Sequence, residues 1–168
     1  TKTIQLIVNP LPTLAPTSPP ACANEPLQLN ANAAAGTPGY TYSWTGPGTI
    51  NTSVLANPTV TGLAAGLRTF TVTVSDINSC TATAQTLATI RAVPVVSPSS
   101  TAICAGLTLN LSSNASGGVP GYTYSWAGPG TINTSSSVNP SVTGLTFGSY
   151  TYSVTVRDSY SCSVTGQT

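Results

Sequence analysis

The stretch PGYTYSWTGPGTINTS at Pro38–Ser53 returns at Pro120–Ser135, where Ala127 in place of Thr45 is the single difference. In both copies aromatic residues alternate with hydroxyl residues and are followed by a Gly-Pro-Gly turn. Alternation with a period of two is typical of a β-strand with one buried face. The two copies are 82 residues apart. A repeat of this period indicates tandem copies of one small domain.

The same register extends from this stretch to both ends of the chain. Residues 1–8 (TKTIQLIV) fall in the register of residues 83–90 (TAQTLATI), which close the first repeat. Residues 163–168 begin the equivalent closing strand of the second repeat. The sequence therefore predicts three segments. They are a closing strand of a preceding repeat at residues 1–9, a first repeat at residues 10–91, and a second repeat at residues 92–168 that lacks the end of its last strand.

The overlap in register between the two ends predicts that the chain is a window cut from a longer array. A continuous polypeptide is the simpler way to complete the second repeat. The alternative is a copy placed head to tail that donates residues 1–9 as a strand. In either arrangement the expected partners are neighbouring copies of the same repeat.

Runs of alternating apolar and polar residues recur through each repeat, separated by turns rich in Gly, Pro and Asn. No segment has a sustained helical period. Many short strands bounded by turns in about 80 residues predict an antiparallel β-sandwich with the Trp of the third strand in its core. Each repeat is expected to bury one Tyr, one Trp and two Val. These core candidates are Tyr42, Trp44, Val72, Val74, Tyr124, Trp126, Val154 and Val156.

The composition excludes several classes of function. Charged residues make up 4% of the chain and the formal net charge is +1, so electrostatics does not point to nucleic acid or an anionic membrane. No apolar run approaches the roughly 18 residues of a membrane span. The chain has no His, and its carboxylates are Asp76, Asp158 and Glu25. Without a base for a Ser nucleophile or a pair of carboxylates, we expect no enzymatic activity, no cofactor and no metal site.

Two Cys in each repeat, at equal spacing, indicate a disulfide framework and an exported protein. In a sandwich with alternating strand directions, Cys22 and Cys80 fall at opposite poles of one domain. A disulfide needs Cα atoms within about 7 Å, whereas a strand of seven residues spans about 23 Å. We therefore predict an inter-domain Cys22 to Cys162 bridge, with Cys80 and Cys104 bonded to neighbouring repeats. The alternative pairs Cys22 with Cys80 and Cys104 with Cys162.

The aromatic strand of the first repeat has two interpretations. Tyr40, Tyr42 and Trp44 point to one side of the strand, as in modules that stack on sugars. The same face must also pack against Val72 and Val74, and a sandwich of this size has few other large residues to fill its core. Core packing is therefore favoured, with the Tyr hydroxyl groups at the rim.

The order of motifs in the second repeat resembles a known family. GYTYSW at residues 121–126, Asn139-Pro140, YTYSVTVRD at residues 150–158 and the closing Cys162 are similar to PKD-like and immunoglobulin-like repeats of large Bacteroidota surface proteins, such as gliding-motility adhesins. Both repeats share the pattern. It departs from typical PKD domains at residues 44–48 (WTGPG), where acidic residues usually follow the Trp.

The resemblance implies an all-β fold of two tandem immunoglobulin-like antiparallel β-sandwiches, with export to the cell surface and a spacer or adhesin role rather than an enzymatic one. Residues 90–94 (IRAVP) join the repeats with no Gly or Ser spacer, so the joint is expected to be stiff and the domains to form a head-to-tail rod.

Two functions remain open for such a chain. The favoured one is a structural repeat unit of an extracellular stalk, adhesin shaft or filament of a bacterial surface protein. The alternative is a carbohydrate- or surface-binding adhesin module that recognises glycans through loops such as residues 45–51. Near-identity of the repeats favours the structural role, because specific recognition usually needs one loop to differ.

Overall fold

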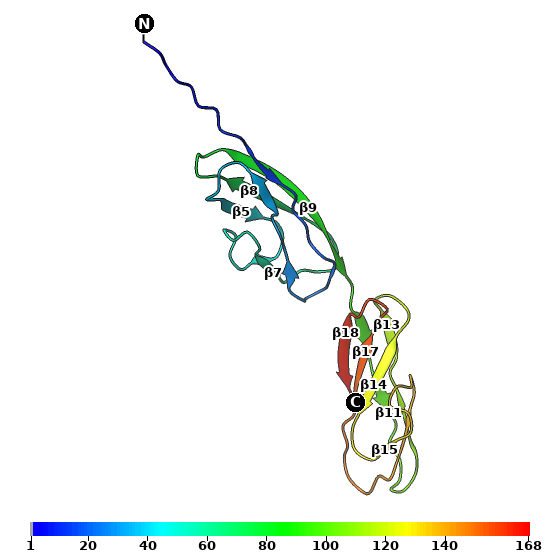
Figure 1. Ribbon diagram of the computed structural model, residues 1–168. Helices are drawn as coiled ribbons and strands as arrows, with labels where there is room; N and C mark the ends of the chain where they lie inside the picture. Colours follow the sequence, from blue (N-terminus) through cyan, green and yellow to red (C-terminus); the bar gives the residue numbers. More distant parts are fainter. Residues whose placement is uncertain (1) are drawn as a thin grey trace. The chain divides into compact units, whose positions relative to one another are not determined.

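The computed structural model describes residues 2–168, which form strands, turns and loops but no helix (Figure 1). The chain divides into two compact units, Thr1–Arg91 and Ala92–Thr168, and each is described by itself. No helix long and apolar enough to cross a membrane occurs in the part of the chain that the structure describes. The predicted all-β class is therefore confirmed.

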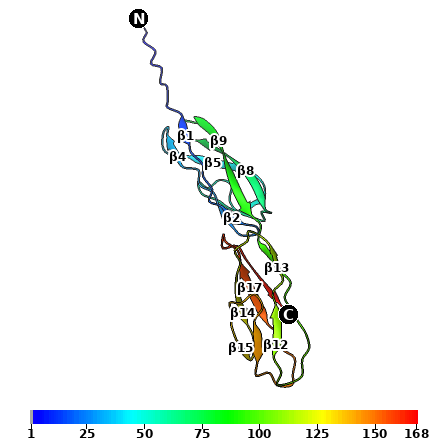
Figure 2. The ribbon, with the colours of Figure 1, turned by 90° about the vertical axis from the view of Figure 1, so that its right-hand side faces the viewer.

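Unit 1 is a β-sandwich. One sheet has the order β2-β9-β8-β5, a second has the order β3-β7-β6, and β1 pairs with β4 (Figures 1 and 2). The strands are β1 (Pro12–Leu14), β2 (Ala21–Cys22), β3 (Leu27–Gln28), β4 (Ala33–Ala35), β5 (Thr41–Thr45), β6 (Thr49–Ile50), β7 (Thr59–Thr61), β8 (Gly66–Ser75) and β9 (Thr81–Arg91).

Unit 2 has a similar architecture, but its closing strand is shorter, it has no counterpart of β2, and its β11 corresponds only to an isolated bridge between Thr17 and Asn30 in unit 1. Its sheets have the orders β14-β17-β18 and β11-β12-β16-β15, and β10 pairs with β13. The strands are β10 (Pro94–Val96), β11 (Ser99–Ser100), β12 (Leu109–Ser112), β13 (Ala115–Gly117), β14 (Thr123–Ala127), β15 (Thr131–Ile132), β16 (Ser141–Thr143), β17 (Ser153–Arg157) and β18 (Ser163–Gln167).

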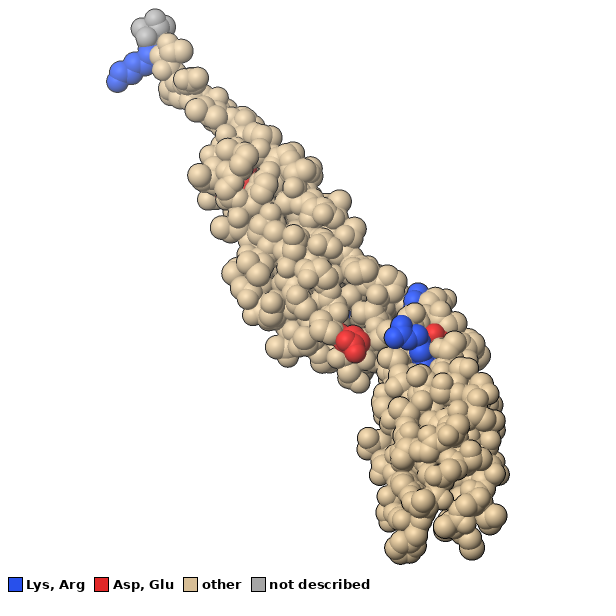
Figure 3. Space-filling model, turned by 60° about the horizontal axis from the view of Figure 1, so that its bottom comes forward, with Lys and Arg blue, Asp and Glu red and all other residues tan. Residues whose placement is uncertain are grey.

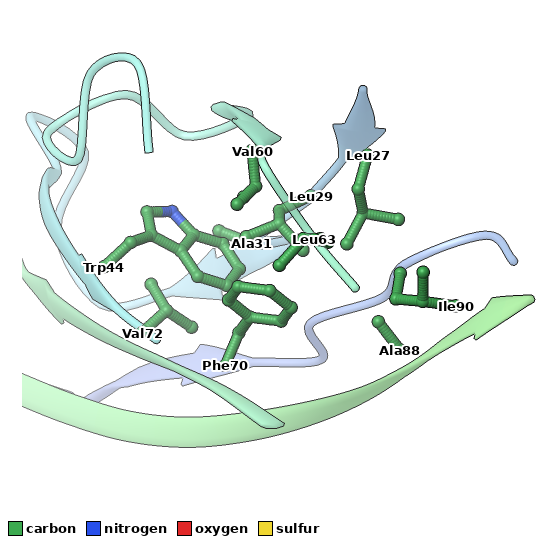
Figure 4. Close-up of a cluster of buried hydrophobic side chains, with 10 residues drawn as sticks. All are labelled: Leu27, Leu29, Ala31, Trp44, Val60, Leu63, Phe70, Val72, Ala88 and Ile90. Carbon is green, nitrogen blue, oxygen red and sulfur yellow. The ribbon is translucent and has the colours of Figure 1, made fainter. Parts of the chain in front are cut away.

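The core of unit 1 lies between its two sheets (Figure 4). Trp44 of β5 lies opposite Val72 of β8 in the antiparallel register, and both side chains are buried. The other sheet contributes Leu27 and Val60, and β9 contributes Ile90. Side chains on one face of each strand thus meet across the sandwich, as the alternating sequence predicts.

Unit 2 has an equivalent core, in which Trp126 lies opposite Val154 and both are buried. Val156 is also fully buried, as Val74 is in unit 1. Tyr42 and Tyr124 are only partly buried and pack against the edge of their core clusters. A tyrosine is placed well at a core edge, because its ring is apolar while its hydroxyl group needs a polar partner or water.

The closing strands of the two units differ in length. In unit 1 the eleven-residue β9 pairs with β8 from Ser75↔Thr81 to Gly66↔Ile90. In unit 2 the five-residue β18 pairs with β17 only as far as Ser153↔Gln167. Residues 148–151 consequently belong to no strand, although their equivalents in unit 1 lie in β8.

The N-terminal segment that the sequence assigns to a preceding repeat forms no strand over residues 2–10, and its apolar side chains are exposed. Thr1, the first residue of that predicted strand, lies outside the described residues. The assignment of residues 1–9 as a closing strand stays a prediction.

Candidate functional site

The two buried carboxylates organise turns. In unit 1 the Asp76 Oδ1 atom accepts hydrogen bonds from the Asn78 and Cys80 amides, each at 2.9 Å, and Oδ2 accepts one from the Thr37 amide at 3.0 Å. The bond from Thr37, with those from Cys80 and Asn78, outweighs the opposing effect of burial and lowers the pKa of Asp76. The amide of Asn78, two residues on, is one of the three donors, as is usual for an Asp that opens a turn.

Asp158 makes the matching set of contacts in unit 2. Its Oδ1 atom accepts bonds from the Tyr160 and Cys162 amides at 2.9 Å, and its Oδ2 atom accepts one from Val119 at 3.1 Å. Each carboxylate thus fastens the turn that precedes the closing strand to a loop far away in sequence. No group of three or more His, Cys, Asp or Glu side chains that could hold a metal ion occurs among residues 2–168.

The aromatic strand is used for packing and for local hydrogen bonds. Trp44 is buried and donates its Nε1 hydrogen to the Leu55 carbonyl at 3.1 Å. The Tyr40 hydroxyl donates to the Ala35 carbonyl, and its ring meets the Tyr42 ring edge-on at 6.4 Å between centroids. Burial, and then the nearby Tyr40, raise the pKa of Tyr42. The burial of Trp44 and the partial burial of Tyr40 and Tyr42 favour packing over stacking on a sugar.

The loop at residues 45–51, the candidate recognition loop, is ordered by its own contacts. The Asn51 Oδ1 atom accepts hydrogen bonds from the Thr52 amide at 2.7 Å and the Thr59 amide at 3.0 Å. Gly46 lies against the ring of Phe70, where an added Cβ would come within 2.3 Å of Cδ1. In unit 2 Asn133 makes the same pair of bonds to its own loop. The loop therefore has the same construction in both units.

A cavity of about 320 Å³ opens in unit 2 beside residues 148–152. Its walls combine apolar and aromatic residues with polar ones such as Ser100, Thr101 and Thr146. The lining residues are Ser100, Thr101, Ala102, Ile103, Cys104, Ala105, Leu109, Leu145, Thr146, Phe147, Gly148, Tyr150 and Tyr152. The equivalent residues of unit 1 surround the second half of β9, because Ala21 and Gly66 both pair with Ile90. We call this cavity the strand groove.

The sequence predicted that the last strand of the second repeat is incomplete, but it did not predict the strand groove beside that strand. Phe147 at its rim is 98% exposed, and the equivalent position in unit 1 is Ala65. A large aromatic residue where the other repeat has Ala was the available signal. Burial, and then the nearby Tyr150, raise the pKa of Tyr152 at the base of the groove.

The four cysteines fall into two classes. Cys22 and Cys162 are each disulfide-bonded, whereas Cys80 and Cys104 are free thiols, with Cys104 exposed. Neither intra-repeat pair of the alternative scheme is therefore formed, because each would need one of the free thiols.

No family model and no curated protein matches the chain at the level of sequence. Among solved structures, the chain is similar to the C-terminal 282-residue fragment of intimin in complex with the intimin-binding domain of its translocated receptor. The identity is 12%, the match covers 93% of this chain and 62% of that one, and the TM-score is 0.57.

Two further solved structures are multidomain proteins. The fibronectin(III)-like modules of CbhA from Clostridium thermocellum match with 13% identity over 94% of this chain and 91% of theirs, at a TM-score of 0.42. The eight N-terminal Ig domains of the Down syndrome cell adhesion molecule match with 13% identity over 95% of this chain and 24% of that one, at a TM-score of 0.45. The chain spans less than two thirds of the intimin and cell adhesion molecule structures. These likenesses concern the fold alone, and the chain is an all-β protein with immunoglobulin-like β-sandwich architecture.

Proposed function

We propose that the chain is a structural repeat unit of an extracellular stalk, adhesin shaft or filament of a bacterial surface protein, similar to PKD-like repeats of Bacteroidota. The observation that carries this proposal is the equivalence of the two units at the level of single hydrogen bonds. Trp44 donates to Leu55 and Trp126 to Ser137, each at 3.1 Å, and the two buried Asp turns match as well. A copied module with unchanged loops makes a shaft longer. It does not add a recognition surface of new specificity.

The surface supports a passive role. Figure 3 shows one face on which uncharged residues predominate. Outward hydroxyl groups pair across neighbouring strands, as between Thr73 and Thr83 at 2.9 Å and between Thr155 and Thr165 at 2.8 Å. Such pairs satisfy an exposed sheet face without charge. An uncharged sheet face whose hydroxyl groups hydrogen-bond to each other suits a spacer outside the cell.

Disulfides between repeats would stiffen such a shaft. We infer that Cys22 and Cys162 bond to each other and so join successive repeats, and that Cys80 and Cys104 bond to neighbouring repeats in an array. The inference is supported by the division of the cysteines into bonded Cys22 and Cys162 and free Cys80 and Cys104. Together with the short joint at residues 90–94, such bridges favour a head-to-tail rod over a flexible string.

Electron microscopy of the native extracellular material tests the structural role. We expect rods with regular beads, at a spacing of about 35 to 40 Å if each domain extends along the rod axis by the length of its strands. Globular particles without a repeat along an axis would contradict a shaft.

The alternative role is an adhesin module that binds glycans or another surface. The likeness to intimin supports this alternative role, because that structure contains a receptor domain bound to intimin. The loop at residues 45–51 is the candidate contact. Binding of the two-unit chain to a glycan array, lost on replacing Pro47 and Gly48 but kept on replacing the distant Thr83 of β9, would favour recognition over the structural role.

A further inference from the structure

A backbone ladder in unit 1 continues past the two strands that begin it. β3 pairs with β7 in an antiparallel register. Beyond these strands, the Leu29 amide donates to the Pro58 carbonyl and the Ala31 amide donates to the Ala56 carbonyl, each at 3.0 Å. Ala31 is fully buried and belongs to the core cluster (Figure 4). The last hydrogen bond of this ladder therefore lies beside a buried methyl group.

The same ladder in unit 2 ends one hydrogen bond earlier. The Leu111 amide donates to the Pro140 carbonyl at 3.0 Å, as its counterpart in unit 1 does. By the repeat, the next bond would join the Ser113 amide to the Val138 carbonyl. Neither of these two groups has a hydrogen-bond partner among the residues that the structure describes. Unit 2 thus has an open position in its ladder where unit 1 has a direct bond.

The two residues at this open position both differ between the repeats. Ser113 stands where the first repeat has Ala31, and Val138 stands where it has Ala56. The Leu and Pro of the preceding hydrogen bond are the same in both repeats. Ser113 is fully buried, whereas the Val138 side chain is 45% exposed. The differences therefore add a hydroxyl group on the inside at the point where the ladder is open.

The Ser113 hydroxyl group is buried without a partner in the protein. Its Oγ atom forms no hydrogen bond with any described residue. Such a group destabilises a fold, and buried polar groups in native proteins nearly always bond to protein or to ordered water. The other polar replacement in this core is satisfied, because Tyr152, in place of Phe70, donates its hydroxyl hydrogen to the Pro129 carbonyl at 3.1 Å. Ser113 is therefore an exception that requires a partner.

The loop opposite Ser113 is fixed on both sides of Val138. Before it, the Ser137 carbonyl accepts a hydrogen bond from Trp126 Nε1 at 3.1 Å. After it, the Pro140 carbonyl is bound to the last closed position of the ladder. The Val138 carbonyl is thus held between two anchored residues and faces the end of the ladder without a partner.

We propose that a water molecule is bound between Ser113 and Val138 and completes the ladder of unit 2. The water accepts hydrogen bonds from the Ser113 amide and from the Ser113 hydroxyl group, and it donates one to the Val138 carbonyl. Three partners are usual for a buried water, and a bridging water is nearly as favourable as a direct bond. One ligand therefore satisfies three polar groups. This site goes beyond the proposed structural role and does not depend on it.

A crystal structure of the full chain, at a resolution that shows ordered water, tests the site directly. We expect one water within hydrogen-bond distance of the Ser113 amide nitrogen, the Ser113 Oγ atom and the Val138 carbonyl oxygen. A direct bond between the Ser113 amide and the Val138 carbonyl would overturn the proposal. A hydroxyl group that bonds to another protein atom, or a site without ordered water, would overturn it as well.

Hydrogen exchange of the full chain tests the energetic consequence in solution. Ser113→Ala removes the hydroxyl group. Because the water already satisfies that group, exchange of the β17 amides in the core of unit 2 should slow by no more than about threefold. If the hydroxyl group had no partner, its removal would stabilise unit 2, and the same amides would exchange at least about tenfold more slowly. Slowing beyond about threefold would count against the water.

The matched control places the same hydroxyl group in unit 1. Ala31→Ser adds it beside a backbone hydrogen bond that is already closed, so the hydroxyl group gains no bridging water. Exchange of the β8 amides should become at least about tenfold faster. Equally small effects of Ala31→Ser and Ser113→Ala would show that a buried hydroxyl group is tolerated without water, and would overturn the proposal. A variant whose unit 1 does not fold would agree with the expected cost, and Ser113→Ala would then decide.

Discussion

At the scale of single residues, this fold depends on a few side chains that hold backbone turns. Asp76 is the clearest example, because three amides from two separate loops donate to its carboxylate. Its counterpart Asp158 does the same in unit 2. In a chain with few charges, these two carboxylates hold turns to distant loops.

The hydrogen bonds to Asp76 predict a stability that depends on pH. Because the folded-state pKa is lowered, the contribution is complete above the unfolded pKa, near about pH 4, and is lost as pH falls through the folded pKa. Asp76→Asn should therefore destabilise unit 1 at pH 7 and have a smaller effect at pH 2. The measurement is the urea midpoint of unit 1 at both pH values, followed by the NMR signals of the Thr37 and Cys80 amides. An equal loss at both values would contradict the assignment.

Gly46 provides a steric prediction at the same scale. An added Cβ would lie 2.3 Å from Cδ1 of Phe70, a fully buried ring. We expect Gly46→Ala to destabilise unit 1 by about 1–3 kcal/mol, the usual cost of forcing extra volume into a packed core. Hydrogen exchange of unit 1 peptides, detected by mass spectrometry, measures the change.

The neighbouring substitution Thr45→Ala is the control for Gly46→Ala. Unit 2 already has Ala127 at the equivalent position, and Thr45 is exposed. Its effect should remain within about 0.5 kcal/mol. A large effect at Thr45 would show that the loop, rather than the contact with Phe70, controls stability.

At the scale of elements, the closing strand decides how complete each sandwich is. Its sequence alternates, so the period of two predicts a strand but not its partners. Only the pairing of β9 with both β8 and β2 shows that its second half closes the core of unit 1. In unit 2, β18 ends at Gln167, and the strand groove lies at the position that the second half of β9 occupies in unit 1.

The two faces of β9 should respond differently to truncation. Ile90→Ala is expected to cost unit 1 about 2–5 kcal/mol, because the side chain is buried against the core cluster. Leu87→Ala removes a side chain that is 57% exposed and should change stability by no more than about 0.5 kcal/mol. Thermal unfolding of both variants, compared with the parent chain, would contradict this assignment if the two shifts were equal.

At the scale of the whole molecule, the chain is two copies of one module, and the proposed role depends on how copies are joined. Cysteine chemistry is the most direct reporter of that connection. The structure separates bonded Cys22 and Cys162 from free Cys80 and Cys104. Equivalent positions in the two repeats therefore differ in chemical state, which an isolated domain would not explain.

Peptide mapping without reduction tests the inferred inter-repeat bridge. For the isolated chain we expect one linked pair of peptides that contains Cys22 and Cys162, and alkylation of Cys80 and Cys104 without prior reduction. Recovery of a Cys22 to Cys80 peptide would contradict the bridge. Cys22→Ser is the companion variant: it should make the Cys162 thiol reactive to alkylation and leave both Trp residues buried.

The sequence by itself determined the repeat, the alternating strands and the buried Trp in each unit. These features are periodic, because the buried face of a strand is set by the alternation of neighbouring residues. The tertiary structure alone decided that Tyr42 is only partly buried beside the core and that Cys80 and Cys104 stay free. These depend on contacts between segments distant in sequence, which the identity of neighbouring residues does not specify.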